Sequence, residues 1–350
     1  MSKLRRLFKK RTIPVSFFST PDAPLDISLF DSPEYLKISR QGFSIKGIQI
    51  LHSASVHYFP KHRDKCYRRY WNSYLDIFHN ISDTSYEGLF LNAGEGAEFQ
   101  AKSSEVIAVG LCISLACRLL DVKVAQISVI EGSGKRCDFS LIKGGLEYLI
   151  ESKGRKGSVA SARSGIYYKK LASDPLCPKY GFLSRLPRNG QKVDMEVMDP
   201  EYIPREVPRS EMIQRLLDRY SRLAYSANFW RLGDELDRIY IRLSNGENLS
   251  LFENVPLDFG NVLKLGDLFT LEHNGTRYLS FDDPHQEFRF FPSLDEFRVI
   301  SLISEDVLNL LSKQSYEALL GYDCPEFVSE DFNKSFSVMS DGSAIAMLKP

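Results

Sequence analysis

The sequence lacks the short patterns that identify several large enzyme classes. Its six cysteines include no CxxC pair and its six histidines show no HxH or HExxH spacing, so neither a zinc site nor a disulfide framework is indicated. A GxSxG nucleophile elbow and a GxxxxGK[ST] phosphate loop are also absent. We therefore expect neither a serine hydrolase of that type nor a phosphate-loop nucleotidase.

Long apolar runs, internal repeats and low-complexity tracts are missing as well. The most apolar stretch, Val106 to Leu120, is interrupted by Ser114 and Arg118 and is shorter than a membrane-spanning helix. The first eleven residues hold six basic side chains, but no apolar signal-peptide core follows them. These features predict a soluble, cytoplasmic protein with no membrane partner.

The chain has no net charge, because 45 basic residues balance 45 acidic ones, yet the two signs are unevenly distributed. Residues 1–232 hold 36 basic and 24 acidic side chains, a net charge of +12, whereas residues 233–350 carry −12. Only the first part has a charge suited to a polyanion such as nucleic acid. With 43% hydrophobic and 12% aromatic residues, 350 residues suffice for two or three packed domains.

Changes of pattern along the chain predict three parts. Residues 1–94 are expected to form an α+β region rich in basic and aromatic side chains, with short extended runs such as 43–51 and a helix at 61–82. Residues 95–232 contain a mixed α/β domain and a C-terminal amphipathic helix, which Ser210 would cap.

The third part, residues 233–350, is expected to be an acidic, β-rich module. The dipeptides Asn274-Gly275 and Asp341-Gly342 lie between short β-type runs and are preferred hairpin turns. One helix is predicted near residues 305–320. The pattern therefore indicates a folded module rather than a flexible acidic tail.

The central part alternates helices with short strands. An apolar helix is predicted to start at Ser103 or Ser104, and it must be buried because it has almost no polar face. The elements expected after it are strands at 124–130, 138–142 and 146–152, a helix at 158–171, and strands at 181–186 and 193–198. This order predicts an α/β fold with helices on the faces of a central sheet, whose first three strands form an antiparallel meander.

Asp138 and the tripeptide Glu151-Ser152-Lys153 are the sharpest candidates for a catalytic site. Side chains alternate along a strand, so Glu151 and Lys153 point to one face. If the strands pair through a turn at Gly144-Gly145, Asp138 lies opposite this end of the neighbouring strand. Two carboxylates would then offer hard oxygen ligands to Mg²⁺, and Lys153 could orient a bound water as an ammonium group or deprotonate it as a neutral amine.

This arrangement resembles the PD-(D/E)xK nuclease superfamily, and the resemblance covers about residues 95–200. It implies a restriction-endonuclease-like α-βββ-α-ββ core in which Asp138, Glu151 and Lys153 are the catalytic residues. Asp138 and Glu151 would be metal ligands, together with an acid on the first helix, either Glu105 or Glu98.

Two features of the sequence depart from the family pattern. Cys137 replaces the proline that precedes the motif aspartate, and the helix after Lys153 lacks the glutamine and tyrosine of the RecB-like branch. Structural explanations of the same residues also stay open. Glu151 and Lys153 could form an exposed ion pair at a strand end, and Glu105 could merely favour the positive end of a helix dipole.

Basic residues are concentrated around the candidate site. Between residues 135 and 170 there are nine basic side chains against three acidic ones, an excess that would attract a phosphate backbone. The expected contacts to nucleic acid are Arg155, Lys156, Arg163, Lys135 and Arg136. The basic and aromatic stretch at 61–71 could track a nucleic-acid backbone or be a solvated helix face.

We therefore expect a metal-dependent endonuclease that hydrolyses phosphodiester bonds with Mg²⁺, or with Mn²⁺ in its place. Double-stranded DNA is the favoured substrate, although the sequence leaves RNA open. By analogy with other uses of the fold, the protein would be an effector of bacterial antiphage defence or restriction. The alternative is a catalytically silent nucleic-acid-binding or scaffolding subunit. In both cases the C-terminal module would bind a protein partner or a second copy of the chain.

Overall fold

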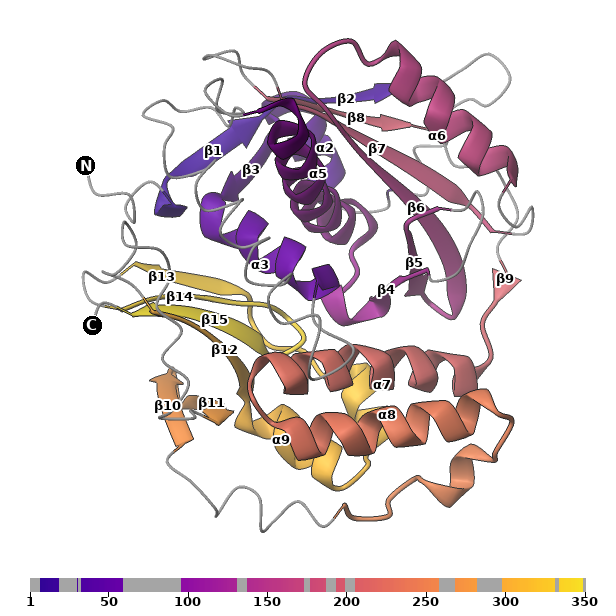
Figure 1. Ribbon diagram of the computed structural model, residues 1–350, viewed down its shortest axis with the longest axis vertical. Coiled ribbons are helices and arrows are strands. Elements are labelled where there is room, and N and C mark those ends of the chain that lie inside the picture. Colours follow the sequence, from indigo (N-terminus) through magenta and orange to yellow (C-terminus); the bar gives the residue numbers. More distant parts are fainter. Residues whose placement is uncertain are drawn as a thin grey trace. The chain divides into compact units, whose positions relative to one another are not determined.

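The structure, a computed structural model, describes residues 7–18, 30, 33–58, 96–130, 137–172, 177–186, 193–198, 205–257, 268–281, 298–330 and 334–348 (Figure 1). The helix predicted at 61–82 lies outside these residues. Contacts divide the described chain into two compact units, and along the chain the division falls between Val207 and Pro208. Each unit combines helices with β-sheet, so the fold class is mixed α/β.

The first unit is built on a seven-stranded sheet. Along the chain its strands are β2 (Val15–Phe18), β4 (Ile127–Val129), β5 (Phe139–Lys143), β6 (Leu146–Arg155), β7 (Lys179–Arg185), β8 (Asp194–Met198) and β9 (Arg205–Glu206). Their order in space is β2-β8-β7-β6-β5-β4, and β9 pairs with the beginning of β6 (Figure 1). Strands β4, β5 and β6 form the predicted antiparallel meander.

Two helices pack on opposite faces of this sheet. Helix α5 (Ala97–Leu120) crosses β6 at Gly154, where an added Cβ atom would lie 2.2 Å from the Ser104 carbonyl oxygen. Helix α6 (Ala160–Ala172) instead packs at Gly181 of β7, where a Cβ would lie 2.5 Å from Ile166. Gly181 pairs with Glu151, which is on the other face of β6 from Gly154 because side chains alternate along a strand.

Helix α6 also explains the pairing of β6 with β7. These two strands are parallel, and a parallel pair needs a long crossover between its strands, which α6 provides. The predicted succession of three strands, a helix and two strands is thus confirmed, with shifts of one to three residues at the ends of the elements.

The predicted start of the apolar helix was wrong. Helix α5 begins at Ala97 and not at Ser103, and both Ser103 and Ser104 are buried within it. The Ser104 hydroxyl donates to the carbonyl of Ala101, one turn back, so it caps no backbone N–H at a helix end. Gly96 occupies the N-cap position without a side-chain hydrogen bond. The serine pattern misled because a serine is also tolerated inside a helix when its hydroxyl bonds a carbonyl one turn back.

Helix α5 is covered as its composition required. Among the helices of the described ranges, only α5 is long and apolar enough to be a candidate membrane span, and 83% of its apolar window is buried inside the protein. Such burial is typical of a core helix, so the apolar sequence is weak evidence for a membrane span.

The N-terminal residues belong to the same unit as the central sheet. Strand β2 adds to it in parallel with β8. A second, two-stranded sheet pairs β1 (Lys10–Ile13) with β3 (Phe43–Lys46). Helix α2 (Pro33–Gln41) precedes β3, and helix α3 (Gly47–Tyr58) follows it directly. The extended run predicted at 43–51 therefore ends at residue 46. The division predicted at 94/95 does not coincide with the compact units, because β2 pairs across it.

The second unit contains a six-stranded antiparallel sheet. Its order is β10-β11-β12-β15-β14-β13, formed by β10 (Leu268–His273), β11 (Thr276–Phe281), β12 (Arg298–Ser304), β13 (Phe327–Glu330), β14 (Lys334–Val338) and β15 (Ser343–Leu348). The hairpin turns at Asn274-Gly275 and at Asp341-Gly342 are confirmed. Asn274, Gly275 and Gly342 have positive φ angles, which explains the choice of these residues.

Four helices accompany this sheet in the described residues: α7 (Arg209–Ser226), α8 (Trp230–Ser244), α9 (Glu305–Ser312) and α10 (Tyr316–Gly321). Helix α7 starts after Pro208, so the predicted cap at Ser210 was wrong. A buried ion pair of 2.6 Å joins Arg219 of α7 to Asp341 in the β14–β15 turn. Helix α7 thus belongs with the C-terminal sheet, and the compact unit begins at 208 rather than at the predicted 233.

The close approach of α5 to β6 gives a first prediction. Replacing Gly154 by alanine would force its Cβ against the Ser104 carbonyl, and we expect a loss of about 1–3 kcal/mol in the free energy of unfolding. Urea unfolding measures this loss. Gly157→Ala is the matched control, since among the described residues nothing except its chain neighbours lies within 4 Å of the added Cβ, and equal stabilities of the two variants would contradict the packing.

Candidate active site

The register of the β5–β6 hairpin brings Asp138 to the end of β6. Gly144 and Gly145, both with positive φ, form the turn and pair Lys143 with Leu146. In the resulting β5–β6 register Phe139 pairs with Ile150. The backbone N–H of Asp138 donates to the Ile150 carbonyl at 2.9 Å. The predicted approach of Asp138 to the Glu151 end of β6 is therefore confirmed.

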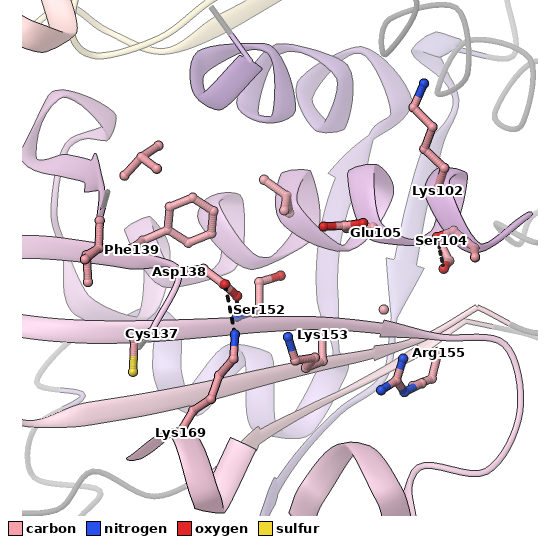
Figure 2. Close-up of a pocket in the computed structure, with 15 residues that line it drawn as sticks. Lys102, Ser104, Glu105, Cys137, Asp138, Phe139, Ser152, Lys153, Arg155 and Lys169 are labelled. Carbon is pink, nitrogen blue, oxygen red and sulfur yellow. Dashed lines mark hydrogen bonds and ion pairs between the residues drawn. The ribbon is translucent and has the colours of Figure 1, made fainter. Parts of the chain in front are cut away.

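The last residues of β6 extend beyond β5. From Glu151 to Arg155 the strand continues alongside β7, whereas β5 starts only at Phe139. This overhang leaves a cavity of about 700 Å³ beside the end of β6. The charged residues that line it are Lys102, Glu105, Asp138, Lys153, Arg155 and Lys169 (Figure 2).

Both candidate carboxylates contact the same ammonium group. Lys169 Nζ lies 3.3 Å from Asp138 Oδ1 and 2.7 Å from Glu151 Oε1. Lys153 Nζ lies 2.6 Å from the same oxygen of Glu151. The second oxygen of Asp138 accepts a hydrogen bond of 3.0 Å from the backbone N–H of Ser152. Asp138, Glu151 and Lys153 are thus brought together as the sequence predicted.

Lys169 is the site residue that the sequence analysis did not single out. It comes from α6, and Figure 2 shows it pointing from that helix toward Asp138. A signal was available in the sequence, because the apolar residues Ala162 and Ile166, which the structure buries, lie seven and three residues before it. That spacing puts a lysine on the face of α6 that packs against the sheet.

Glu151 is buried, unlike its partners. Its side chain has no exposed surface, whereas Asp138 is 33%, Lys153 24% and Lys169 27% exposed. Within the described residues, Oε2 of Glu151 has no hydrogen-bond partner. Oε1 lies within ion-pair distance of both lysines, but neither contact is aligned as a hydrogen bond. A buried carboxylate with an unused oxygen is costly unless a cation compensates it.

The surroundings shift the protonation of this cluster. Burial raises the pKa of Glu151 to about 7, the nearby charge of Asp138 acts in the same direction, and Lys153 and Lys169 oppose both. Burial by itself would lower the pKa of Lys169. The contact with Glu151 and the charge of Asp138 outweigh it, so the pKa of Lys169 is raised and the side chain is cationic.

Of the two acids considered on helix α5, Glu105 lines the cavity and Glu98 does not. Glu105 lines the cavity and faces the same space as Lys153 (Figure 2). Glu98 lies in the first turn of α5 and is exposed, and it is not among the residues that line the cavity. Because the helix begins at Ala97, Glu105 is too far along it to serve the helix dipole. Its role as a metal ligand stays a prediction.

The basic residues expected to bind nucleic acid differ in how they are engaged. Arg155 is exposed and lines the cavity, and Lys156 donates to Gln100 at 3.1 Å. Arg163 forms a two-pronged ion pair with Glu196, at 2.6 and 2.8 Å, and stacks over Phe18. Lys135, Arg136 and the stretch at 61–71 lie outside the described residues. Arg163 therefore has its charge partly neutralised inside the protein.

The carboxylates fit a divalent ion that needs few protein ligands. The described part of the chain contains no group of three or more His, Cys, Asp or Glu side chains suited to a metal. Mg²⁺ is commonly held by only one or two carboxylates, together with water and phosphate oxygens. Asp138 and Glu151 offer two such carboxylates: Asp138 lines the cavity with Glu105, whereas Glu151 is buried next to Lys153 and Lys169 and is not among the lining residues.

Comparisons with known proteins found no relative of this chain. No protein-family model, curated protein or solved structure matches the chain significantly. The resemblance to PD-(D/E)xK nucleases therefore depends on the residues, their order in the chain and their geometry.

The raised pKa of Glu151 predicts how stability depends on pH without metal. Between its usual pKa of about 4.5 and about 7, the folded protein keeps a proton that the unfolded chain has released. The free energy of unfolding contributed by Glu151 therefore falls as pH rises through this window. In EDTA, wild type should lose more stability between about pH 5 and about pH 8 than Glu151→Gln, as measured by urea unfolding.

The control for this measurement is Glu98→Gln, which changes an exposed carboxyl group of helix α5. It should lose as much stability over the same interval as wild type. If Glu151→Gln behaves like this control, the carboxyl group of Glu151 is not in the buried environment described above.

Proposed function

We propose that the first unit is a metal-dependent endonuclease that hydrolyses phosphodiester bonds, with DNA as substrate and Mg²⁺ or Mn²⁺ as cofactor. One observation carries the proposal: a fully buried glutamate, Glu151, has an oxygen without a hydrogen-bond partner in the described residues, and Lys169 joins it to Asp138. Asp138 lines a cavity together with three lysines and Arg155. Proteins avoid a buried carboxylate of this kind unless it has a cationic partner or a function.

The order of elements supports the same family. A buried helix, an antiparallel meander, a crossover helix and two further strands follow one another, as expected for a restriction-endonuclease-like α-βββ-α-ββ core. Asp138 directly precedes the second strand of the meander and Glu151 and Lys153 lie on the third. These are the positions that the PD-(D/E)xK pattern implies.

The proposed roles follow from the contacts. Asp138 and Glu151 would hold the metal ion, with Glu105 as a further acid; of the three, Asp138 and Glu105 line the cavity. A bound Mg²⁺ would polarise the phosphate and lower the pKa of a bound water. Lys153 points to the same face as Glu151 and would orient that water, accept its proton or stabilise negative charge on the phosphate. Arg155 lines the cavity and would position the backbone.

The wider biological role is also a proposal. By analogy with other proteins that have a restriction-endonuclease-like fold, we propose an effector of bacterial antiphage defence or restriction, located in the cytoplasm. The acidic second unit would bind a protein partner or a second copy, since its ordered sheet offers a folded surface.

A second function is favoured by a specific observation. Lys153 and Lys169 already contact Glu151, and Lys169 also contacts Asp138, so the cluster contains two acids and two bases without any added ion. A cluster whose acidic charges are balanced by its own lysines needs no metal ion, as expected of a catalytically silent nucleic-acid-binding or scaffolding subunit.

Cleavage by the full-length protein distinguishes these functions. With Mg²⁺ or Mn²⁺, wild type should cleave plasmid or linear duplex, and EDTA should stop it. Asp138→Asn, Glu151→Gln and Lys153→Ala should each lower the rate by roughly 100-fold or more, because each removes a metal ligand or the proposed base. Lys143→Ala, at the opposite end of β5, is the control and should retain the rate. Binding of duplex without any metal-dependent cleavage would support the silent subunit instead.

The basic residues differ in whether an acid of the protein already pairs with them, and this difference predicts how much each contributes to the binding of nucleic acid. In the absence of cleavage, Arg155→Ala with Lys156→Ala should weaken duplex binding and make its dependence on salt shallower, by about one unit of slope for each phosphate that is no longer bound. Arg163→Ala should change the slope little, because Glu196 already pairs with that guanidinium. Binding isotherms at several salt concentrations measure these slopes. An unchanged slope in the double variant would place the nucleic acid elsewhere, for instance along residues 61–71.

A further inference from the structure

Lys169 occupies the space between the two proposed metal ligands. Its ammonium nitrogen is within 3.3 Å of Asp138 Oδ1 and 2.7 Å of Glu151 Oε1, so it is the group that joins the two carboxylates. Lys153 differs, since its ion pair within the described residues is with Glu151. Figure 2 shows Lys169 reaching toward Asp138 from a helix. This helix is α6, whereas Asp138 and Glu151 both belong to the β5–β6 hairpin.

The electrostatics of the cluster make this position a cation site. Two carboxylates, one of them fully buried, repel each other, and a positive charge between them offsets this repulsion. The Lys169 ammonium supplies that charge from a side chain that is 27% exposed and lines the cavity. A divalent ion held by the same two oxygens would meet the ammonium at close range, where like charges repel strongly.

The flexible stem of Lys169 allows the two cations to alternate. A lysine side chain ends in a point charge on a four-carbon chain, and it can leave one partner for another without movement of the backbone. The cavity beside it provides about 700 Å³ into which the ammonium can turn. Asp138, next to β5, and Glu151, within β6, can stay in place while Lys169 leaves.

We propose that Lys169 is a tethered cation that holds the metal position in the metal-free protein, so that a divalent ion binds only by displacing it. The proposal rests on the metal-dependent function proposed above and adds a positioning residue that the PD-(D/E)xK motif does not include. Lys169 keeps Glu151 and Asp138 compensated before the ion arrives, and it lowers the affinity of the site for the ion.

Titration of the full-length protein with Mn²⁺ alone, followed by calorimetry, tests the proposal. Lys169→Met should bind Mn²⁺ at least about tenfold more tightly than wild type, because the competing charge is gone. Lys169→Gln should show the same gain, and Lys169→Arg, which keeps the charge, should bind about as weakly as wild type. Lys143→Met removes one positive charge at the far end of β5 and should change the affinity less than about twofold.

Asp138→Asn identifies the Mn²⁺ binding that belongs to this site. Introduced into wild type or into the Lys169→Met variant, it should abolish that binding in both. If wild type binds Mn²⁺ through Asp138 but neither Lys169→Met nor Lys169→Gln binds it more tightly, the tethered-cation proposal fails and the metal site stands. If no variant binds Mn²⁺ in an Asp138-dependent manner, both proposals fail. Circular dichroism in EDTA establishes that each variant is folded before the titration.

Discussion

The burial of one carboxylate, that of Glu151, constrains the architecture of the first unit. A charged group without solvent contact must be compensated by nearby cations, or it destabilises the fold. Compensation comes from two directions: Lys153 from two residues along the same strand, and Lys169 from the helix that connects β6 to β7. The charge is compensated, but Oε2 of Glu151 has no hydrogen-bond partner among the described residues and can still accept a ligand. We interpret this remaining capacity as the place where the protein exchanges an internal cation for a functional one.

The rest of the unit serves to bring these groups together. The glycine turn between β5 and β6 fixes the register, and the register puts Asp138 beside Glu151. The parallel pairing of β6 with β7 requires a crossover on one face, and α6 is that crossover. Gly154 lets α5 approach β6 from the other face, which places Glu105 over the cavity. Local turn chemistry and close helix packing together therefore determine the geometry of the site.

The sequence was sufficient for those features that depend on short-range pattern. Alternation, turn dipeptides and apolar runs located the meander, the β10–β11 and β14–β15 hairpins of the second unit and the pairing of Asp138 with the Glu151 end of β6. It was insufficient where tertiary packing decides. Serines that resemble caps are buried inside α5, Gly47 begins a helix in an apparently extended run, and β2 joins a sheet whose other strands lie more than a hundred residues away. Lys169 was hidden for a related reason, because its partners are distant in the chain and only its helical face hinted at them.

The central claim is that Asp138 and Glu151 form a divalent metal site. Its most direct test is an anomalous diffraction map from crystals of the protein grown or soaked with Mn²⁺, recorded so that manganese scatters anomalously. We expect one strong peak in contact with carboxylate oxygens of both residues, and a Lys169 side chain turned away from them. A peak elsewhere, or no peak while Lys169 still joins the two carboxylates at high Mn²⁺ concentration, would contradict it.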